Sequence, residues 1–409
     1  MIFRRFFPST IPHFRSTLPV AVAENQPLET KNRMTNSVTF SAYAARLRDF
    51  IRRHSAAGGS NGNPSLEPEF NRLALELFAL QFVHNAPCRK FCEARQITPH
   101  TIKNWNEIPA LPAVGFKEFE MTSLTPAERT EVFHSSGTTG QQPSRHFHHA
   151  ESLALYEASL LPWFAAYILA DIALANRSHN FLALTPPPAQ APNSSLVHMF
   201  RTIFRQFGSR HSVFTGLAQS DGSWNLDLDK TLEILREAIT SKSPVILLGT
   251  AFNYVHLLDH LSENSVRLPL PQGSRALETG GYKGRSRTMP KAELHQLITE
   301  LLSIPDSAIV CEYGMSELSS QAYDSIAGAR TGGRKFQFPP WARAQIISPE
   351  TGREAGEGET GLIRLFDLAN VYSVMAIQTE DLGVRHGGGF ELLGRASVSE
   401  PRGCSLQSA

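Results

Sequence analysis

Short apolar runs alternate with helical segments from about residue 180 onward, and this alternation constrains the fold more than any other feature of the chain. The apolar runs are 181–185, 245–249, 276–279 and 308–312. Helical segments over 196–207 and 252–261 lie between them. Such alternation is typical of parallel strands joined by crossover helices, so we predict an α/β fold with a parallel sheet. Because open α/β sheets bind ligands beyond the carboxyl ends of their strands, we expect the loops after residues 279 and 312 to line a site.

The pattern changes after Trp341. Short extended runs at 344–347 and 362–366 flank Gly-rich turns, which predicts a small antiparallel β-subdomain. We therefore expect a leader, an α/β core, a small β-subdomain and a mobile tail. Their expected bounds are 1–34, 35–340, 341–398 and 399–409.

The first 34 residues have the composition of a transit-like segment. They carry Arg4, Arg5 and Arg15 but no acidic residue before Glu24. A periodic apolar pattern begins only after Met34. Of the two interpretations, a targeting segment and a leader that is disordered or not native, we favour the leader, with Met34 as the working start.

The composition describes a globular protein that acts on small molecules. Of the 409 residues 41% are hydrophobic and 19% are charged, and the formal net charge is only +1, so the basic surface of a nucleic-acid binder is missing. The longest apolar stretch is interrupted by Pro162 and Asp171, which argues against a membrane span. Four unevenly placed cysteines do not form a disulfide framework and fit a reducing cytoplasm.

Residues 70–92 show apolar side chains at helical spacing, so we predict one amphipathic helix there. His84, Cys88 and Cys92 follow one another at four-residue spacing on this predicted helix. That spacing could seat a metal, but no fourth ligand lies nearby in the sequence. We therefore interpret the three residues as core packing and assign no zinc site.

A run of hydroxyl and glycine residues is the sharpest local signal. It consists of Ser135, Ser136, Gly137, Thr138, Thr139 and Gly140. The glycines allow a tight turn that aims backbone N–H groups at an anion, and the hydroxyls add further donors, so the run suits a triphosphate. It lacks the Gly-Lys-Ser/Thr ending of a Walker loop. The alternative is a surface turn, which composition alone would favour.

This hexapeptide resembles the phosphate loop of the adenylate-forming superfamily, and three further segments follow in that superfamily's order. They are 312–317, 379–383 and 394–395. The resemblance implies that Tyr313 lies beside the adenine and that Gly314 and Ser316 also bind the nucleotide. It further implies that Glu317 binds Mg²⁺, that Asp381 accepts the ribose hydroxyls, and that Arg395 lies near ribose and phosphate. A carboxylate is a hard oxygen ligand for Mg²⁺, and a second carboxylate can accept two O–H donors.

The chain departs from the superfamily's pattern at three places. Glu380 replaces a common glycine, and Ser144 or Arg145 stands near the usual lysine after the loop. The superfamily also continues into a lid domain with a catalytic lysine, whereas this chain ends at Ala409, so we expect the lid to be absent. Lys283, in a glycine loop at the site mouth, could then steady phosphate charge in its place.

Other segments resemble the acyl-protein synthetase (LuxE-type) branch of that superfamily. They are 105–112 with 116–117, the loop that contains Gly280, Gly281 and Lys283, and 394–406. In that branch a cysteine near the C-terminus carries the acyl group, which implies this role for Cys404. Arg402 would favour the Cys404 thiolate over the thiol.

Two other groups compete for roles at the site. Cys311 directly precedes the motif at 312–317, but its position in a strand favours packing. His146, His148 and His149 could bind phosphate or a metal, but no acidic or Cys partner accompanies them, so solvated or structural histidines are the simpler interpretation.

The resemblance implies a cytoplasmic enzyme that uses ATP and Mg²⁺ to activate a fatty acid and passes the acyl group through Cys404 to a partner, an acyl reductase or acyl carrier. One alternative is a phenylacetate-type acyl-CoA ligase, in which coenzyme A supplies the accepting thiol. The other is a degenerate, non-catalytic adenylate-forming fold, suggested by Glu380 and the expected loss of the lid. The thiol that accepts the acyl group distinguishes the two enzymes.

Overall fold

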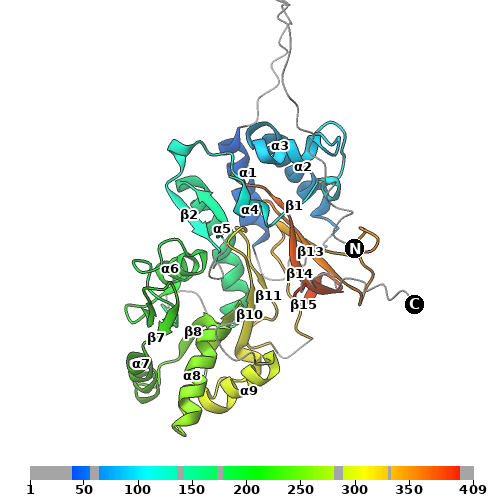
Figure 1. The fold of residues 1–409 in the computed structure, drawn as a ribbon. Helices are drawn as coiled ribbons and strands as arrows, with labels where there is room; N and C mark the ends of the chain where they lie inside the picture. The colour runs from blue at the N-terminus through cyan, green and yellow to red at the C-terminus, as the bar shows by residue number, and fades with distance from the viewer. Residues whose placement is uncertain are drawn as a thin grey trace, which may run out of the picture.

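The computed structural model describes residues 39–55, 64–135, 142–172, 178–280, 289–329 and 333–396. Two sheets and the helices that cover them account for most of these residues (Figure 1). None of the helices in these ranges is long and apolar enough to cross a membrane.

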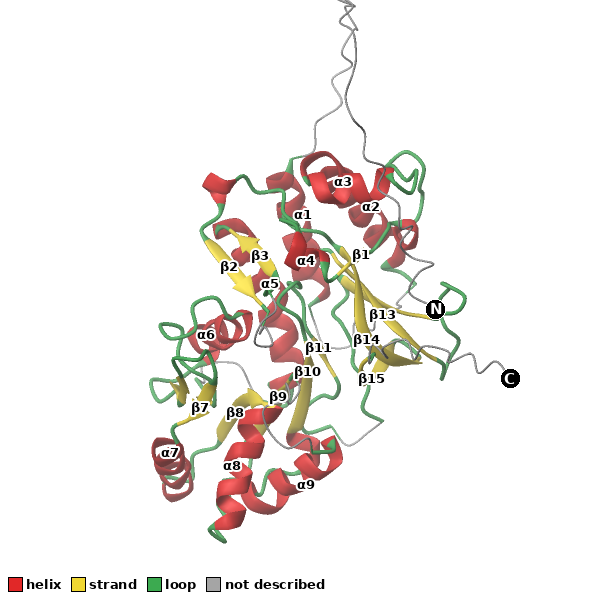
Figure 2. Ribbon diagram, viewed as in Figure 1, coloured by secondary structure: helices red, strands yellow, loops and turns green. Residues whose placement is uncertain are grey.

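The larger sheet has six strands in the order β11-β10-β9-β8-β4-β5. Their bounds are β4 Asn180–Ala183, β5 Val213–Phe214, β8 Val245–Thr250, β9 Arg275–Thr279, β10 Ile309–Tyr313 and β11 Ala322–Tyr323. Figure 2 labels β8, β9, β10 and β11 of this sheet. All neighbours are parallel except β10 and β11, which are antiparallel. The parallel sheet predicted from the four apolar runs is therefore confirmed, since those runs coincide with β4, β8, β9 and β10.

Both faces of this sheet are buried, which explains why its strands are nearly continuous apolar runs. Along β4, Phe181 and Ala183 belong to one hydrophobic cluster, whereas Leu182 and Leu184 belong to the other. The first cluster includes residues of α5 and α6, and the second includes residues of α7, α8 and α9. These helices are α5 Ala150–Ile168, α6 Ser195–Phe207, α7 Leu228–Thr240, α8 Ala251–Glu263 and α9 Lys291–Leu302.

The smaller sheet confirms the predicted antiparallel β-subdomain. Its strands are β1 Leu111–Pro112, β12 Ala342–Ile347, β13 Thr360–Asp367, β14 Ala376–His386 and β15 Gly389–Arg395. The order is β1-β14-β13-β12, and β15 also pairs with β14. β1 comes from much earlier in the chain and pairs in parallel with β14, which the local pattern did not predict.

Two short hairpins complete the strands. They are β2 Glu131–His134 with β3 Arg145–His148, and β6 Gly216–Ala218 with β7 Trp224–Leu226. The remaining helices are α1 Phe40–His54, α2 Glu67–His84, α3 Ala86–Glu93 and α4 Gly115–Glu118, with short 3-10 helices η2 Trp105–Glu107, η3 Pro126–Glu128 and η4 Asp306–Ala308.

The single helix predicted over 70–92 is wrong, because the chain breaks between α2 and α3 at Asn85. Pro87 has no N–H and its ring would clash with a preceding carbonyl, so α2 cannot continue through it. Asn85 is extended, and its side chain accepts a 3.1 Å hydrogen bond from the backbone N–H of Cys88. Cys88 and Cys92 pack in the core as predicted, but His84 is exposed, so the three residues do not share a face.

The carboxylate of Asp367, at the end of β13, holds the segment that follows β10. One oxygen accepts the backbone N–H groups of Ser319 and Ser320 at 2.9 and 2.8 Å. The other accepts the Ser320 hydroxyl at 2.7 Å and the N–H of Ala369 at 2.9 Å. Asp367 is only 1% exposed, and burial raises its pKa while these hydrogen bonds oppose the shift.

We expect Asp367→Asn to lower the free energy of unfolding by about 2–3 kcal/mol, because the new NH₂ group would face donors and leave buried N–H groups without an acceptor. Urea denaturation measures the loss. Asp229→Asn, the same change at an exposed position in the first turn of α7, is the control and should cost less than about 1 kcal/mol. Equal effects of the two substitutions would contradict a structural role for Asp367.

Candidate functional site

The structure describes about half of the residues that the sequence assigned to the site. Those described are Ser135, Gly280, Tyr313, Gly314, Ser316, Glu317, Asp381 and Arg395. Those outside the described residues are Ser136, Gly137, Thr138, Thr139, Gly140, Gly281, Lys283 and Cys404.

The base of the predicted phosphate loop contacts Ser316. The loop connects β2 to β3, and the Ser144 N–H donates to the Ser135 hydroxyl at 2.9 Å. The hydroxyls of Ser144 and Ser316 lie 3.2 Å apart. His146 Nδ1 lies 2.9 Å from the carbonyl oxygen of Ser316. Two segments that are 172 residues apart in sequence are therefore joined where the loop begins and ends.

The carboxylate of Glu317 is buried and lies next to this contact. The Ser316 hydroxyl donates to Glu317 Oε2 at 3.0 Å, and the Asn370 side chain donates to the Glu317 carbonyl at 2.8 Å. Glu317 is 7% exposed, and no lysine or arginine within the described ranges pairs with its carboxylate. A buried anion without such a counter-charge fits a divalent cation, because burying a carboxylate is costly unless it is paired or bound to metal.

Tyr313, on β10, and Asp381, on β14, join the two sheets. The Tyr313 hydroxyl donates to Asp381 Oδ2 at 2.8 Å, and burial followed by the Asp381 charge raises the pKa of Tyr313. Arg395 Nε lies 3.5 Å from Asp381 Oδ1, because Asp381 and Arg395 are register partners on β14 and β15. The Arg395 side chain is 77% exposed, so it can turn toward a ligand.

Glu312 and Thr279 lie opposite each other where β10 and β9 end, and the sequence analysis missed their interaction. The Thr279 hydroxyl donates to Glu312 Oε2. Burial raises the pKa of Glu312 to about 7, Thr279 acts against that shift, and the charge of Glu278 adds to it. The Glu312 carboxylate also explains Gly314, because a Cβ there would lie 2.3 Å from Glu312 Oε1. The sequence did contain a signal for this pair, because both residues stand at the end of a predicted strand.

The competing groups are structural. Cys311 is 1% exposed and burial raises the pKa of its thiol, which argues against a nucleophile. His146 and His148 are buried with ring centroids 4.1 Å apart. Burial lowers the pKa of His146 to about 4 and also lowers that of His148, so both are neutral near pH 7. His149 forms the N-cap of α5.

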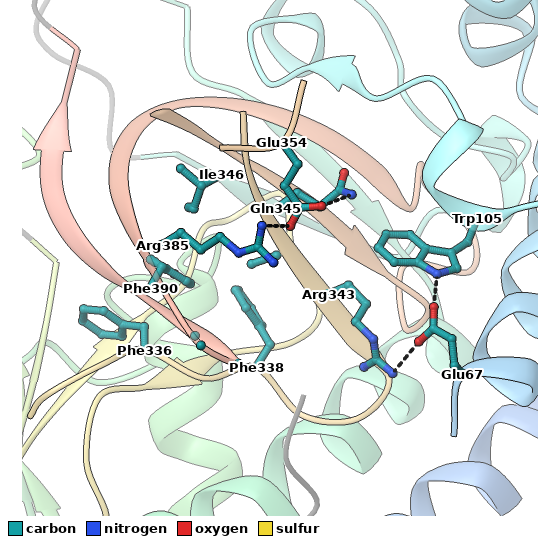
Figure 3. A pocket seen from close by; sticks show the side chains of 14 residues that line it. Glu67, Trp105, Phe336, Phe338, Arg343, Gln345, Ile346, Glu354, Arg385 and Phe390 are labelled. Atoms are coloured by element: carbon teal, nitrogen blue, oxygen red, sulfur yellow. Dashed lines mark hydrogen bonds and ion pairs between the residues drawn. The ribbon is translucent and has the colours of Figure 1, made fainter. Parts of the chain in front are cut away.

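A cavity of about 180 Å³ lies in the β-subdomain, and Figure 3 shows its side chains. Phe336, Phe338 and Phe390 line it and also contact the Tyr313 ring, with centroid distances of 5.5–6.2 Å. Its two arginines face carboxylates, with Arg343 3.8 Å from Glu67 and Arg385 3.4 Å from Glu354. Because a nearby carboxylate balances the positive charge of each arginine, we assign the cavity no role in binding phosphate.

Comparisons with known proteins identify the family of this chain. Residues 62–408 match the family model described as acyl-protein synthetase, LuxE. The long-chain-fatty-acid–luciferin-component ligase of Aliivibrio fischeri is 22% identical over 358 residues, covering 83% of this chain and 87% of the relative. Its counterpart from Vibrio harveyi is 20% identical over 345 residues, covering 82% and 86%.

Among solved structures, the fold resembles that of 2-hydroxyisobutyryl-CoA ligase in an open conformation, in complex with 2-HIB-AMP and CoA. The TM-score is 0.58 with 12% sequence identity, and the match covers 86% of this chain and 79% of that one. The likeness supports the predicted α/β fold with its small β-subdomain. The match to the family model extends over most of the chain, and the chain therefore belongs to the LuxE family of acyl-protein synthetases.

Proposed function

We propose that this protein activates a long-chain fatty acid with ATP and Mg²⁺ and transfers the acyl group to Cys404, from which a partner acyl reductase or acyl carrier receives it. The family and the names of the two relatives support the acid and the ligase reaction. The observation that carries the proposal is the chain of contacts from Ser144 through Ser316 to the buried Glu317 carboxylate.

This chain of contacts sets the base of a hydroxyl- and glycine-rich loop against a buried acid. Backbone N–H groups and hydroxyls of such a loop bind phosphate oxygens, and the acid is suited to hold the metal that accompanies a triphosphate. Bound Mg²⁺ would neutralise charge on the departing pyrophosphate. Glu317 would hold it, and Ser316 would orient the Glu317 carboxylate through its hydroxyl.

Tyr313, Asp381 and Arg395 are suited to the nucleoside. Asp381 can accept two ribose hydroxyls if the Tyr313 hydroxyl releases Oδ2, and the exposed Arg395 guanidinium can reach a phosphate. The Tyr313 ring, packed against three phenylalanines, offers a rigid surface to adenine. In the first step a carboxylate oxygen of the acid attacks the α-phosphorus, and pyrophosphate leaves with the electrons of the broken P–O bond.

Cys404 is the thiol best suited to the second step. Cys88, Cys92 and Cys311 are each at most 3% exposed, so an acyl-adenylate cannot reach them without unfolding. The Cys404 thiolate would attack the acyl carbonyl, a thioester would form, and AMP would leave. Coenzyme A is the competing acceptor, because the fold is shared with a CoA ligase.

We expect Glu317→Gln to reduce acid-dependent ATP–pyrophosphate exchange at least about tenfold, which corresponds to roughly 1.4 kcal/mol of activation free energy. The amide retains the shape of the side chain but loses the charge that would bind the metal. Glu233→Gln, the same change at an exposed position on α7, should leave exchange unaltered. Wild-type exchange in Glu317→Gln would exclude this carboxylate from the reaction.

Cys404→Ser should keep acid-dependent exchange but fail to retain a labelled acyl group after denaturation, since only the second step needs this thiol. Neutral hydroxylamine should release the label from the wild-type protein, as it does from thioesters. Ser405→Ala, a matched change of the neighbouring residue, should be labelled normally. If the wild type never acquires label while coenzyme A is acylated efficiently, the protein is an acyl-CoA ligase instead.

A further inference from the structure

Three metal-ligating side chains converge on the face of the larger sheet that α9 covers. Glu278 and Cys311 are register partners on β9 and β10, and His295 projects from α9. Their side chains are buried, with exposed fractions of 5% for Glu278, 4% for His295 and 1% for Cys311. They are the one group of His, Cys and acidic side chains with metal-binding geometry among the residues that the structure describes.

The distances between their donor atoms match a small coordination sphere. Cys311 Sγ lies 3.0 Å from Glu278 Oε2 and 3.5 Å from His295 Nε2, and the two latter atoms are 3.9 Å apart. Tetrahedral zinc, with bonds of about 2.3 Å to sulfur and about 2.0 Å to nitrogen or oxygen, would separate its ligands by about 3.3–3.6 Å. Small side-chain adjustments would therefore place all three atoms on one ion.

The second ring nitrogen of His295 has the partner that a metal-bound histidine usually has. His295 Nδ1 lies 3.5 Å from Asp306 Oδ1, which also accepts a 3.0 Å hydrogen bond from Arg334. A carboxylate in this position favours the proton on Nδ1 and leaves the Nε2 lone pair directed at Cys311 and Glu278.

The charged groups around the cluster carry a net negative charge, which favours a divalent cation. Lys291 and Arg334 contribute two positive charges, whereas Glu278, Asp324 and Asp306 contribute three negative ones. A divalent cation together with ionisation of the Cys311 thiol would make the set neutral. Lys291 is the competing cation, because it interacts with Cys311 and Glu278.

We propose that Glu278, His295 and Cys311 bind a thiophilic divalent metal ion, for which zinc is the best match to a Cys, His and Glu donor set. Three protein ligands leave the fourth tetrahedral position to a water molecule. The site is separate from Glu317, whose oxygen ligand suits Mg²⁺. The ion would fasten α9 to β9, which ends at Thr279, and to β10, which carries Glu312. Zinc would thereby stiffen the base of the nucleotide site.

The full-length protein, purified without a polyhistidine tag, is loaded with zinc, passed through a desalting column and analysed by elemental mass spectrometry. We expect about one zinc per chain, and a lower melting temperature after its removal with a chelator. Cys311→Ala and Glu278→Gln should each lower the zinc content at least tenfold. His84→Asn, at an exposed histidine outside the cluster, should retain it.

Replacement of zinc by cobalt(II) provides a readout that does not depend on the variants. Thiolate coordination should give the wild-type protein a sulfur-to-cobalt charge-transfer absorption, even if Cys311→Ala or Glu278→Gln fails to fold. Substoichiometric zinc in the wild type, or zinc without the charge-transfer band, would overturn the proposal. Lys291 would then be the cation that neutralises the cluster.

Discussion

The segment that follows β10 is held from three directions, and the rest of the site depends on this constraint. Asp367 and Asn370 bind it from the β-subdomain, and Ser144 binds it from the β2–β3 hairpin. β10 itself fixes its start in the parallel sheet. Since a buried polar group without a partner costs about 1–3 kcal/mol, these contacts leave the segment little freedom. Glu317 is thereby held next to Ser316 and close to Ser144, at the base of the predicted phosphate loop.

The alternation of side chains along β9 and β10 places two polar pairs on opposite faces of the larger sheet. Thr279 and Glu312 interact on one face, whereas Glu278 and Cys311 interact on the other. Successive residues of a strand point to opposite faces, so adjacent positions can serve the proposed nucleotide site and the proposed metal site without sharing atoms. Both pairs come from the same parallel register. A one-residue slip of β10 would exchange the faces and destroy both pairs.

Local patterns were sufficient to predict β4, β8, β9 and β10, since these strands are buried on both faces and therefore read as apolar runs, but not the short parallel strand β5. They were not sufficient for β1, whose two residues pair with β14 far along the chain. The prediction of one continuous helix was wrong because it followed the apolar spacing and did not take account of Pro87. The contact of Ser144 with Ser316 has no periodic signal, and only the family resemblance suggested that these segments belong together.

The transfer of oxygen from the acid to AMP tests the central claim most directly. The full-length protein is incubated with ATP, Mg²⁺ and a long-chain fatty acid whose two carboxyl oxygens are ¹⁸O, and the nucleotide products are analysed by mass spectrometry. If a carboxylate oxygen attacks the α-phosphorus, each AMP formed acquires one ¹⁸O atom when the thiol takes the acyl group. Formation of ADP with ¹⁸O in inorganic phosphate, or of AMP without the label, would contradict an acyl-adenylate mechanism.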